Sequence, residues 1–249
     1  MHRLWSRMTR KIDSKKSKRA APSSVSRIIS STKRWFLRLL AVGMVGLFLV
    51  VGTGAFFNPP TTFYMLQEQS RLGPLAHDWV ALDGVAPVVA RSLVAAEDAN
   101  FCLHWGFDLN AIKSALAEGE GRGASTITQQ VVKNVYLWQG RSWTRKALEA
   151  VLTPMVEAMW SKRRIVEVYL NIAEFDDGVF GILAAAQRSF GITAEMLNAD
   201  QAARLAAVLP APKSRNASEP SAALKKRAAQ IRDGAATIDA DGRANCFQS

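Results

Sequence analysis

The sequence predicts a mainly α-helical exported domain that is preceded by one membrane-spanning helix. Three observations support this fold class: an uncharged apolar run from Leu39 to Phe57, apolar residues at helical spacing through most of the later chain, and few alternating, strand-like segments. Residues 58–249 are numerous enough for one domain with its own core, or for a domain plus a small lobe.

Positive charge is concentrated ahead of the apolar run. The formal net charge is +11, and the first 38 residues hold twelve Lys and Arg against the single acid Asp13. The remainder is balanced, so no folded basic face for nucleic acid is expected. A basic tail of this kind binds anionic surfaces, and any contact it made with DNA would be non-specific.

The apolar run has the length of a membrane span. Its 19 residues would form a helix of about 28 Å, close to the thickness of a bilayer core. Cleaved signal peptides have shorter apolar regions and shorter charged leaders, which favours a retained anchor over a signal peptide. A buried core helix is the remaining alternative. The basic flank predicts a cytoplasmic tail over 1–38, an anchor over 39–57 and an exported domain over 58–249.

The exported part shows several helix signals in order. Pro87 suits the first turn of a helix that ends near Glu97, and Asp108 suits the N-cap of the next one. Thr126 and Gln129 have the spacing of a capping box. Further helices are expected over residues 148–159, with Pro154 inside, and over 165–171, 182–190, 201–209 and 222–231.

Two glutamates are the candidate catalytic groups. Glu97 follows a predicted helix and has apolar neighbours, Phe101 and Trp105 among them, that would raise its pKa as suits a general base. Glu149 lies far along the chain but is able to converge on the same cleft. The alternative for Glu97 is a solvated surface position. The alternative for Asp98 is that its carboxylate accepts hydrogen bonds and only shapes the turn.

Cations and hydrogen-bond donors lie between the two glutamates. Fixed cations would stabilise a leaving diphosphate, which gains charge as a sugar bond breaks; the candidates are Lys133, Arg141, Arg145 and Lys146. An ordinary i, i+4 pair between Arg145 and Glu149 is the alternative. The donors would suit an anion at a helix N-terminus, or would only cap the helix; they are Ser125, Thr126, Thr128, Gln129 and Gln130.

The remaining candidates are left with alternatives. His104 is expected in a structural or cleft-wall role, because His104 and Cys102 are too few ligands for a metal. Cys102 and Cys246 are either a disulfide or two separate thiols. Three tryptophans are expected either at the membrane interface or in the core; they are Trp138, Trp143 and Trp160.

Taken together, the motifs resemble the peptidoglycan glycosyltransferases (glycosyltransferase family 51). The resemblance covers roughly Trp79 to Ile231. The first family motif is met in full by Glu97, Asp98, Phe101, His104 and Gly106. The second motif is met by residues 123–130, with Ala124 where many members have Gly. The third motif is met by Arg145, Lys146 and Glu149, and the fourth is met by residues 162–171. The last motif is met only loosely, around Lys226, Arg227 and Ile231.

The resemblance implies a lysozyme-like helical domain with a small membrane-associated lobe, on the periplasmic side of a bacterial inner membrane. It implies processive polymerisation of lipid II into glycan strands, with release of undecaprenyl diphosphate. Glu97 would be the general base, and Glu149 would assist at the diphosphate or at a divalent metal, Mg or Mn. The expected substrate-binding residues are Asp98, Phe101, His104, Ser125, Thr126, Gln129, Gln130, Lys133, Arg141, Arg145 and Lys146.

The expected partners are lipid II, the growing glycan strand, the membrane and other cell-wall synthesis or division proteins, with no nucleic acid. The nearest enzymatic alternative is a membrane-anchored lysozyme-type hydrolase. Hydrolysis needs two carboxylates but no cluster of cations, so the cations favour a diphosphate leaving group. A non-catalytic cell-wall scaffold is the second alternative, and the presence of both Glu97 and Glu149 argues against it.

Overall fold

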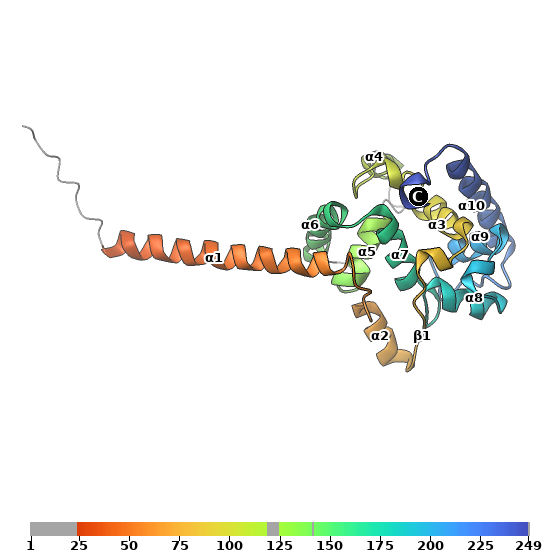
Figure 1. The fold of residues 1–249 in the computed structure, drawn as a ribbon, viewed down its shortest axis with the longest axis horizontal. Coiled ribbons are helices and arrows are strands. Elements are labelled where there is room, and N and C mark those ends of the chain that lie inside the picture. Colours follow the sequence, from red (N-terminus) through yellow and green to blue (C-terminus); the bar gives the residue numbers. More distant parts are fainter. Residues whose placement is uncertain (1–23, 119–124, 141, 249) are drawn as a thin grey trace, which may run out of the picture. The chain divides into compact units, whose positions relative to one another are not determined.

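The computed structural model describes residues 24–118, 125–140 and 142–248 (Figure 1). The chain divides into two units, Met1–Gly46 and Leu47–Ser249. Most described residues lie in helices, as the sequence predicts, and the few strands are two or three residues long.

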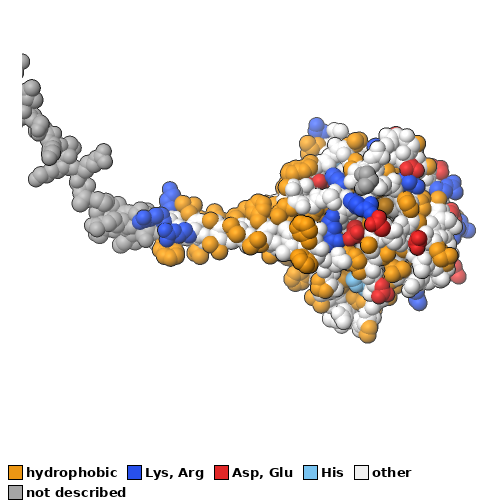
Figure 2. Space-filling model, viewed as in Figure 1, with side chains coloured by type: hydrophobic (Ala, Val, Ile, Leu, Met, Phe, Trp, Pro, Cys, Tyr) orange, Lys and Arg blue, Asp and Glu red, His pale blue; other side chains and the backbone are white. Residues whose placement is uncertain are grey.

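Helix α1 (Ser24–Thr53) contains the apolar run. Its Thr32–Thr53 part is long and apolar enough to cross a membrane, and its side chains are largely exposed (Figure 2). The helix begins inside the predicted tail and ends before Phe57. The predicted anchor boundaries at 39 and 57 therefore mark changes of charge and hydropathy, while the backbone stays helical through the first of them.

The second unit is built from ten further α-helices among the described residues. Three short 3-10 helices, η1 (Leu82–Gly84), η2 (Phe101–Leu103) and η3 (Ala194–Met196), connect some of them. The α-helices are α2 (Phe63–Leu72), α3 (Pro87–Glu97), α4 (Leu109–Glu118), α5 (Ile127–Tyr136), α6 (Trp143–Met159), α7 (Lys162–Ile172), α8 (Ile182–Phe190), α9 (Ala199–Val208), α10 (Ala222–Ala240) and α11 (Asn245–Gln248).

The core has two groups of helices. Helices α3, α9 and α10 pack against one another, and α5 packs against both α6 and α7 (Figure 1). Helix α7 carries the fourth motif, and its apolar residues are buried on several sides, Ile165 and Leu170 completely. The fourth motif therefore supplies core packing. Its Asn171 is fully buried and exchanges hydrogen bonds of 2.8 Å with the backbone of Val80.

A small sheet lies beside α8. Its order is β1 (Ala76–His77), β3 (Val179–Phe180) and β2 (Glu174–Asp176). Strand β1 pairs with β3 in parallel, and β2 pairs with β3 in antiparallel fashion. Strands this short have no readable alternation, which is why the sequence did not predict them.

The predicted caps at the beginnings of two helices are confirmed. Thr126 and Gln129 form a capping box at the start of α5, and the Asp108 carboxylate accepts hydrogen bonds from the backbone of Asn110 and Ala111 in α4. Helix α10 is longer than predicted, and α2 was missed.

The three tryptophans that were expected either in the core or at the membrane interface differ in burial. Trp160 is buried, and its indole N–H donates to the carbonyl of Val51 over 2.8 Å. Trp138 and Trp143 are 45% and 91% exposed. Trp160 is therefore a core residue, and the interface alternative remains for Trp138 and Trp143 alone.

Candidate functional site

Glu97 is the last residue of α3 and is held from α5. Its Oε2 accepts a hydrogen bond of 2.9 Å from Nε2 of Gln130, and the Gln130 Oε1 accepts one of 3.0 Å from the hydroxyl of Tyr169 in α7. This chain orients the Gln130 amide, so its NH₂ group faces the carboxylate. The carboxylate of Glu97 is thus fixed in direction by groups that do not neutralise it.

The pKa of Glu97 is raised above the ordinary value for glutamate. Burial is the main cause, and the neighbouring charge of Asp98 adds to it. The hydrogen bond from Gln130 and the charges of Arg227 and Lys133 act in the opposite direction. A carboxylate with a raised pKa is a stronger proton acceptor, which is the property a general base needs near neutral pH.

A pocket of about 430 Å³ opens at the end of α3. It brings the end of α3 together with the residue before the α5 cap, although the two segments are distant in sequence. The polar side chains that line it are those of Glu97, Asp98, Asn100, Asp108, Ser125 and Thr126. Of the residues expected to bind substrate, Ser125 is exposed there and is free to contact a ligand.

Asp98 and His104 brace the loop that follows Glu97. The Asp98 Oδ1 lies 2.8 Å from Nε2 of His104, and its Oδ2 accepts a hydrogen bond of 3.0 Å from the backbone N–H of Ile127 at the start of α5. Both carboxylate oxygens of Asp98 therefore serve the interior. These bonds fit the structural alternative for both residues, and their expected role in substrate binding stays a prediction.

Phe101 and Gln129, two further residues expected to bind substrate, are buried. The Phe101 ring is completely buried and lies under the ammonium group of Lys162, 4.1 Å from the ring centroid. Gln129 is buried in the capping box, where its Oε1 accepts from the backbone N–H of Thr126 over 3.0 Å. Thr126 lines the pocket, but its hydroxyl donates to the Gly106 carbonyl over 2.7 Å. These side chains stabilise the walls of the site.

Gly106 permits close packing under the first motif. Its φ is +83°, and a Cβ at this position would lie 2.7 Å from Cγ2 of Thr153 and 3.0 Å from Cγ of Glu157. Only glycine adopts such a backbone without strain. The glycine of the motif thus lets the loop after Glu97 rest directly on α6.

Lys133 is close enough to both Glu97 and Glu149 for their charges to act on its pKa. Its pKa is lowered, first by burial and then by the charge of Arg145, while Glu149 and Glu97 raise it. Lys133 is on α5, one helical turn after Gln130, and so faces the same side as the residue that holds Glu97. The structure therefore joins the base candidate to the cation cluster through Lys133.

Glu149 is buried on α6 between two cations. Its Oε2 accepts a hydrogen bond of 2.9 Å from Arg145, and its Oε1 accepts one from Lys146. Glu149 is 3% exposed and Lys146 is 46% exposed at the side chain. Arg145 and Glu149 therefore form the ordinary i, i+4 ion pair that was the alternative for the third motif. The pair differs from a surface pair because the Glu149 carboxylate is buried, while Lys146 remains accessible to solvent.

Three expected positions lie outside the described residues. They are Arg141 and the glycine and alanine of the second motif, Gly123 and Ala124.

Arg227 was missed as a site residue. It is on α10, its guanidinium donates to the carbonyl of Ala96 over 3.2 Å, and its charge acts on Glu97. The signal in the sequence was the loosely met last motif, which was too degenerate to single out one residue. Arg227 places a positive charge at the C-terminal end of α3, beside the base candidate.

The transglycosylase family matches residues 66–236. A biosynthetic peptidoglycan transglycosylase of Jannaschia sp. (strain CCS1) is 55% identical over 92% of this chain and 97% of its own length. One of Escherichia coli O127:H6 (strain E2348/69 / EPEC) is 45% identical over 82% of this chain and 89% of its own.

The chain belongs to the transglycosylase family.

The family match includes the pocket and the cation cluster in one segment. It begins in α2 and ends in α10, so it contains Glu97, Lys133, Glu149 and Arg227. The family resemblance inferred from the motifs is confirmed, and with it the peptidoglycan glycosyltransferase class of enzyme.

Glu149 is the carboxylate beside the cations of this transglycosylase, where a divalent metal is expected. Mg²⁺ is commonly held by one or two carboxylates together with substrate phosphates, and Glu149 is a carboxylate in that position. Two groups of three side chains within the described residues are close enough to hold an ion by themselves, and neither includes Glu97 or Glu149. They are Asp98, His104 and Asp108, and Glu68, Glu174 and Asp177. Both oxygens of Glu149 accept hydrogen bonds from Arg145 and Lys146, so an ion shared with a diphosphate would take the place of one of these contacts, and the metal stays a prediction.

Proposed function

We propose that this transglycosylase polymerises lipid II into glycan strands, with Glu97 as the general base. Glu97 takes the proton of the acceptor 4-hydroxyl, and the oxygen forms a bond to the anomeric carbon of the lipid-linked chain. The bond from that carbon to the diphosphate oxygen breaks, the diphosphate keeps the electron pair, and the configuration inverts. The observation that carries the proposal is a partly buried carboxylate of raised pKa that shares its surroundings with a cation cluster.

The cations stabilise the leaving diphosphate. Glu149 holds Arg145 and Lys146, and Lys133 lies in the same electrostatic surroundings, so charge that develops on the leaving group meets cations that are already close by. Glu149 orders Arg145 and Lys146, and its charge opposes the lowering of the Lys133 pKa by burial and by Arg145. A divalent ion bound by Glu149 and phosphate oxygens would supply further charge neutralisation. Arg141 acts with these cations in the same proposal.

The function is tested with purified full-length protein in detergent, lipid II and a divalent ion, followed by gel separation of the products. Long glycan strands that appear with time are the expected result. Shortening of preformed peptidoglycan would instead identify a hydrolase. Binding of lipid II without any product would identify a scaffold, which is the role that an inactive domain would retain.

The apolar part of α1 anchors this enzyme in a bacterial inner membrane, with the N-terminal tail in the cytoplasm and the catalytic unit in the periplasm. The basic residues on one side of the span support this orientation. A disulfide between Cys102 and Cys246 suits an oxidising compartment. Protease added to spheroplasts is expected to digest a C-terminal epitope tag and to spare an N-terminal one, and the reverse pattern would contradict the orientation.

Other cell-wall synthesis or division proteins remain proposed partners of this enzyme. A lipid-linked substrate confines the reaction to the membrane surface, and the anchor confines the enzyme to the same surface. Proteins that supply or extend the same glycan would meet it there.

A further inference from the structure

The C-terminal segment of the chain lies across the loop that follows Glu97. This segment, residues 243–248, contains α11 and packs against η2 and α7. Arg243 donates a hydrogen bond of 3.1 Å to the carbonyl of Ala99. Cys246 forms a disulfide with Cys102, and the buried ring of Phe247 packs on the ring of Phe101 at 6.4 Å between centroids. A guanidinium, a covalent bond and an aromatic contact thus hold the same loop.

The three contacts fall on residues 99, 101 and 102, within five residues of the base candidate. Glu97 is the last residue of α3, so no further helical turn supports its C-terminal side. The position of its carboxylate therefore depends on the path of the following loop. A loop that was free to shift would move Glu97 relative to Gln130 and Lys133, which are on a different helix.

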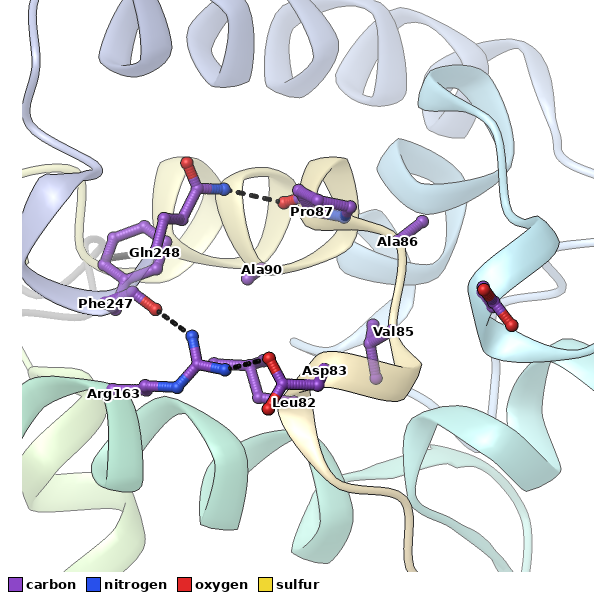
Figure 3. A pocket seen from close by; sticks show the side chains of 10 residues that line it. Leu82, Asp83, Val85, Ala86, Pro87, Ala90, Arg163, Phe247 and Gln248 are labelled. Carbon is purple, nitrogen blue, oxygen red and sulfur yellow. Dashed lines mark hydrogen bonds and ion pairs between the residues drawn. The ribbon is translucent and has the colours of Figure 1, made fainter.

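The segment is itself fixed at points away from the loop (Figure 3). The Gln248 side chain donates to the carbonyl of Pro87 over 3.0 Å, at the beginning of α3. Arg163 of α7 donates to the carbonyl of Phe247 over 3.3 Å and also bonds to Asp83. The C-terminal segment consequently holds α3 at its first residue and at the loop beyond its last one. Glu97 itself is contacted from α5, through the side chain of Gln130.

We infer that Arg243, Cys246 and Phe247 are positioning residues, which hold the loop after Glu97 so that this carboxylate faces the acceptor hydroxyl. The inference rests on the proposed role of Glu97 as the base. Their contacts with the loop are at Ala99, Phe101 and Cys102, and through these residues they act on Glu97. The disulfide makes this arrangement sensitive to reduction, and the main packing of the segment is against η2 and α7, while the cation cluster lies on α5 and α6.

The test compares oxidised and reduced full-length enzyme. Dithiothreitol passes two electrons and two protons from its thiols to the disulfide, which becomes the thiols of Cys102 and Cys246 while the reagent becomes a cyclic disulfide. We expect reduction to lower kcat about tenfold, because small displacements of a catalytic group are costly. KM for lipid II is expected to stay unchanged, since the cations that bind it are not moved. The acid limb of kcat should shift to lower pH as water reaches Glu97.

Variants separate positioning from stability. Cys246→Ser should show the kcat of the reduced enzyme and no response to dithiothreitol, and Phe247→Ala should lose kcat while Phe247→Leu recovers it. Arg232→Ala is the matched control for Arg243→Ala, because Arg232 is an exposed residue of α10 whose ion pairs are with Asp200 and Asp233. If Cys246→Ser does not fold, reduction of folded wild-type enzyme still gives the answer.

Two results would overturn the inference: a reduced enzyme that keeps its kcat and its acid limb while only its unfolding temperature falls, or equal losses in Arg243→Ala and Arg232→Ala. The proposed function is judged separately on the oxidised enzyme. A Glu97→Gln variant that remained active would remove the base assignment, whereas the response of wild-type kcat to reduction would still report whether the segment matters.

Discussion

Glu97→Gln is expected to reduce kcat for glycan-strand synthesis by about 10²–10⁴-fold, the range that a general base contributes. Glutamine keeps the shape of the side chain and is able to hydrogen-bond to Gln130, but it cannot accept the proton of the acceptor hydroxyl. The fold should persist, because Glu97 is only partly buried and removal of its charge relieves the cost of burying it. The measurement is time-resolved strand synthesis, with circular dichroism to verify folding.

The same carboxylate sets the pH dependence of the wild-type enzyme. Burial raises the pKa of Glu97, so the deprotonated base is lost as pH falls through a value above the ordinary glutamate pKa. The acid limb of kcat/KM should therefore lie above that ordinary value. Glu219→Gln, a change of the same kind at an exposed position, is expected to leave rate and profile unaltered. An acid limb at the ordinary glutamate pKa would contradict the buried environment of the base.

Local signals in the sequence predicted the elements that carry the site. Pro87 at the beginning of α3 and the Thr126–Gln129 box at the beginning of α5 are decided by residues three or four apart, and the structure has both. Pro87 and the apolar spacing after it predict a helix that ends near Glu97, and the capping box places Gln130 at the beginning of another helix. The helical fold and the approximate position of the base thus followed from short-range patterns.

The direction of individual side chains did not follow from such patterns. Phe101 and Asp98 belong to the same motif as Glu97, yet Phe101 is completely buried and Asp98 bonds to His104 and to the start of α5. A motif contains residues that act on substrate and residues that hold them in place, and spacing alone does not separate the two. The distinction depends on what packs from segments far away in sequence, here Phe247 and Lys162 around Phe101.

Pairings between distant segments were equally beyond the sequence. Cys102 and Cys246 are 144 residues apart, and no local pattern favoured a bond over two separate thiols. The sheet joins β1 to strands about a hundred residues later, with two or three residues in each strand. Arg227 approaches Ala96 from α10 for the same reason: the packing of α3 against α10 is a property of the whole core.

Lys133→Ala is expected to lower turnover of lipid II by about 10²–10³-fold, the effect of removing one fixed group that stabilises developing negative charge. Lys133 is the cation whose surroundings include both glutamates, and its removal leaves the diphosphate to Arg141, Arg145 and the more exposed Lys146. The rate is measured with saturating and limiting lipid II, so that kcat and KM are separated. Lys225→Ala, at an exposed position of α10, is the matched control and should retain full turnover.

The pKa of Lys133 gives the prediction a second, independent readout. Burial and Arg145 lower this pKa, so the charged amine, and activity with it, is lost as pH rises through a value below the ordinary one for lysine. Glu149 raises the pKa of Lys133, and Glu149→Gln should therefore move the alkaline limb of kcat to lower pH. The limb should disappear in Lys133→Ala, leaving only a low residual rate. An alkaline limb that stayed in place in both variants would assign it to another group and remove Lys133 from the diphosphate site.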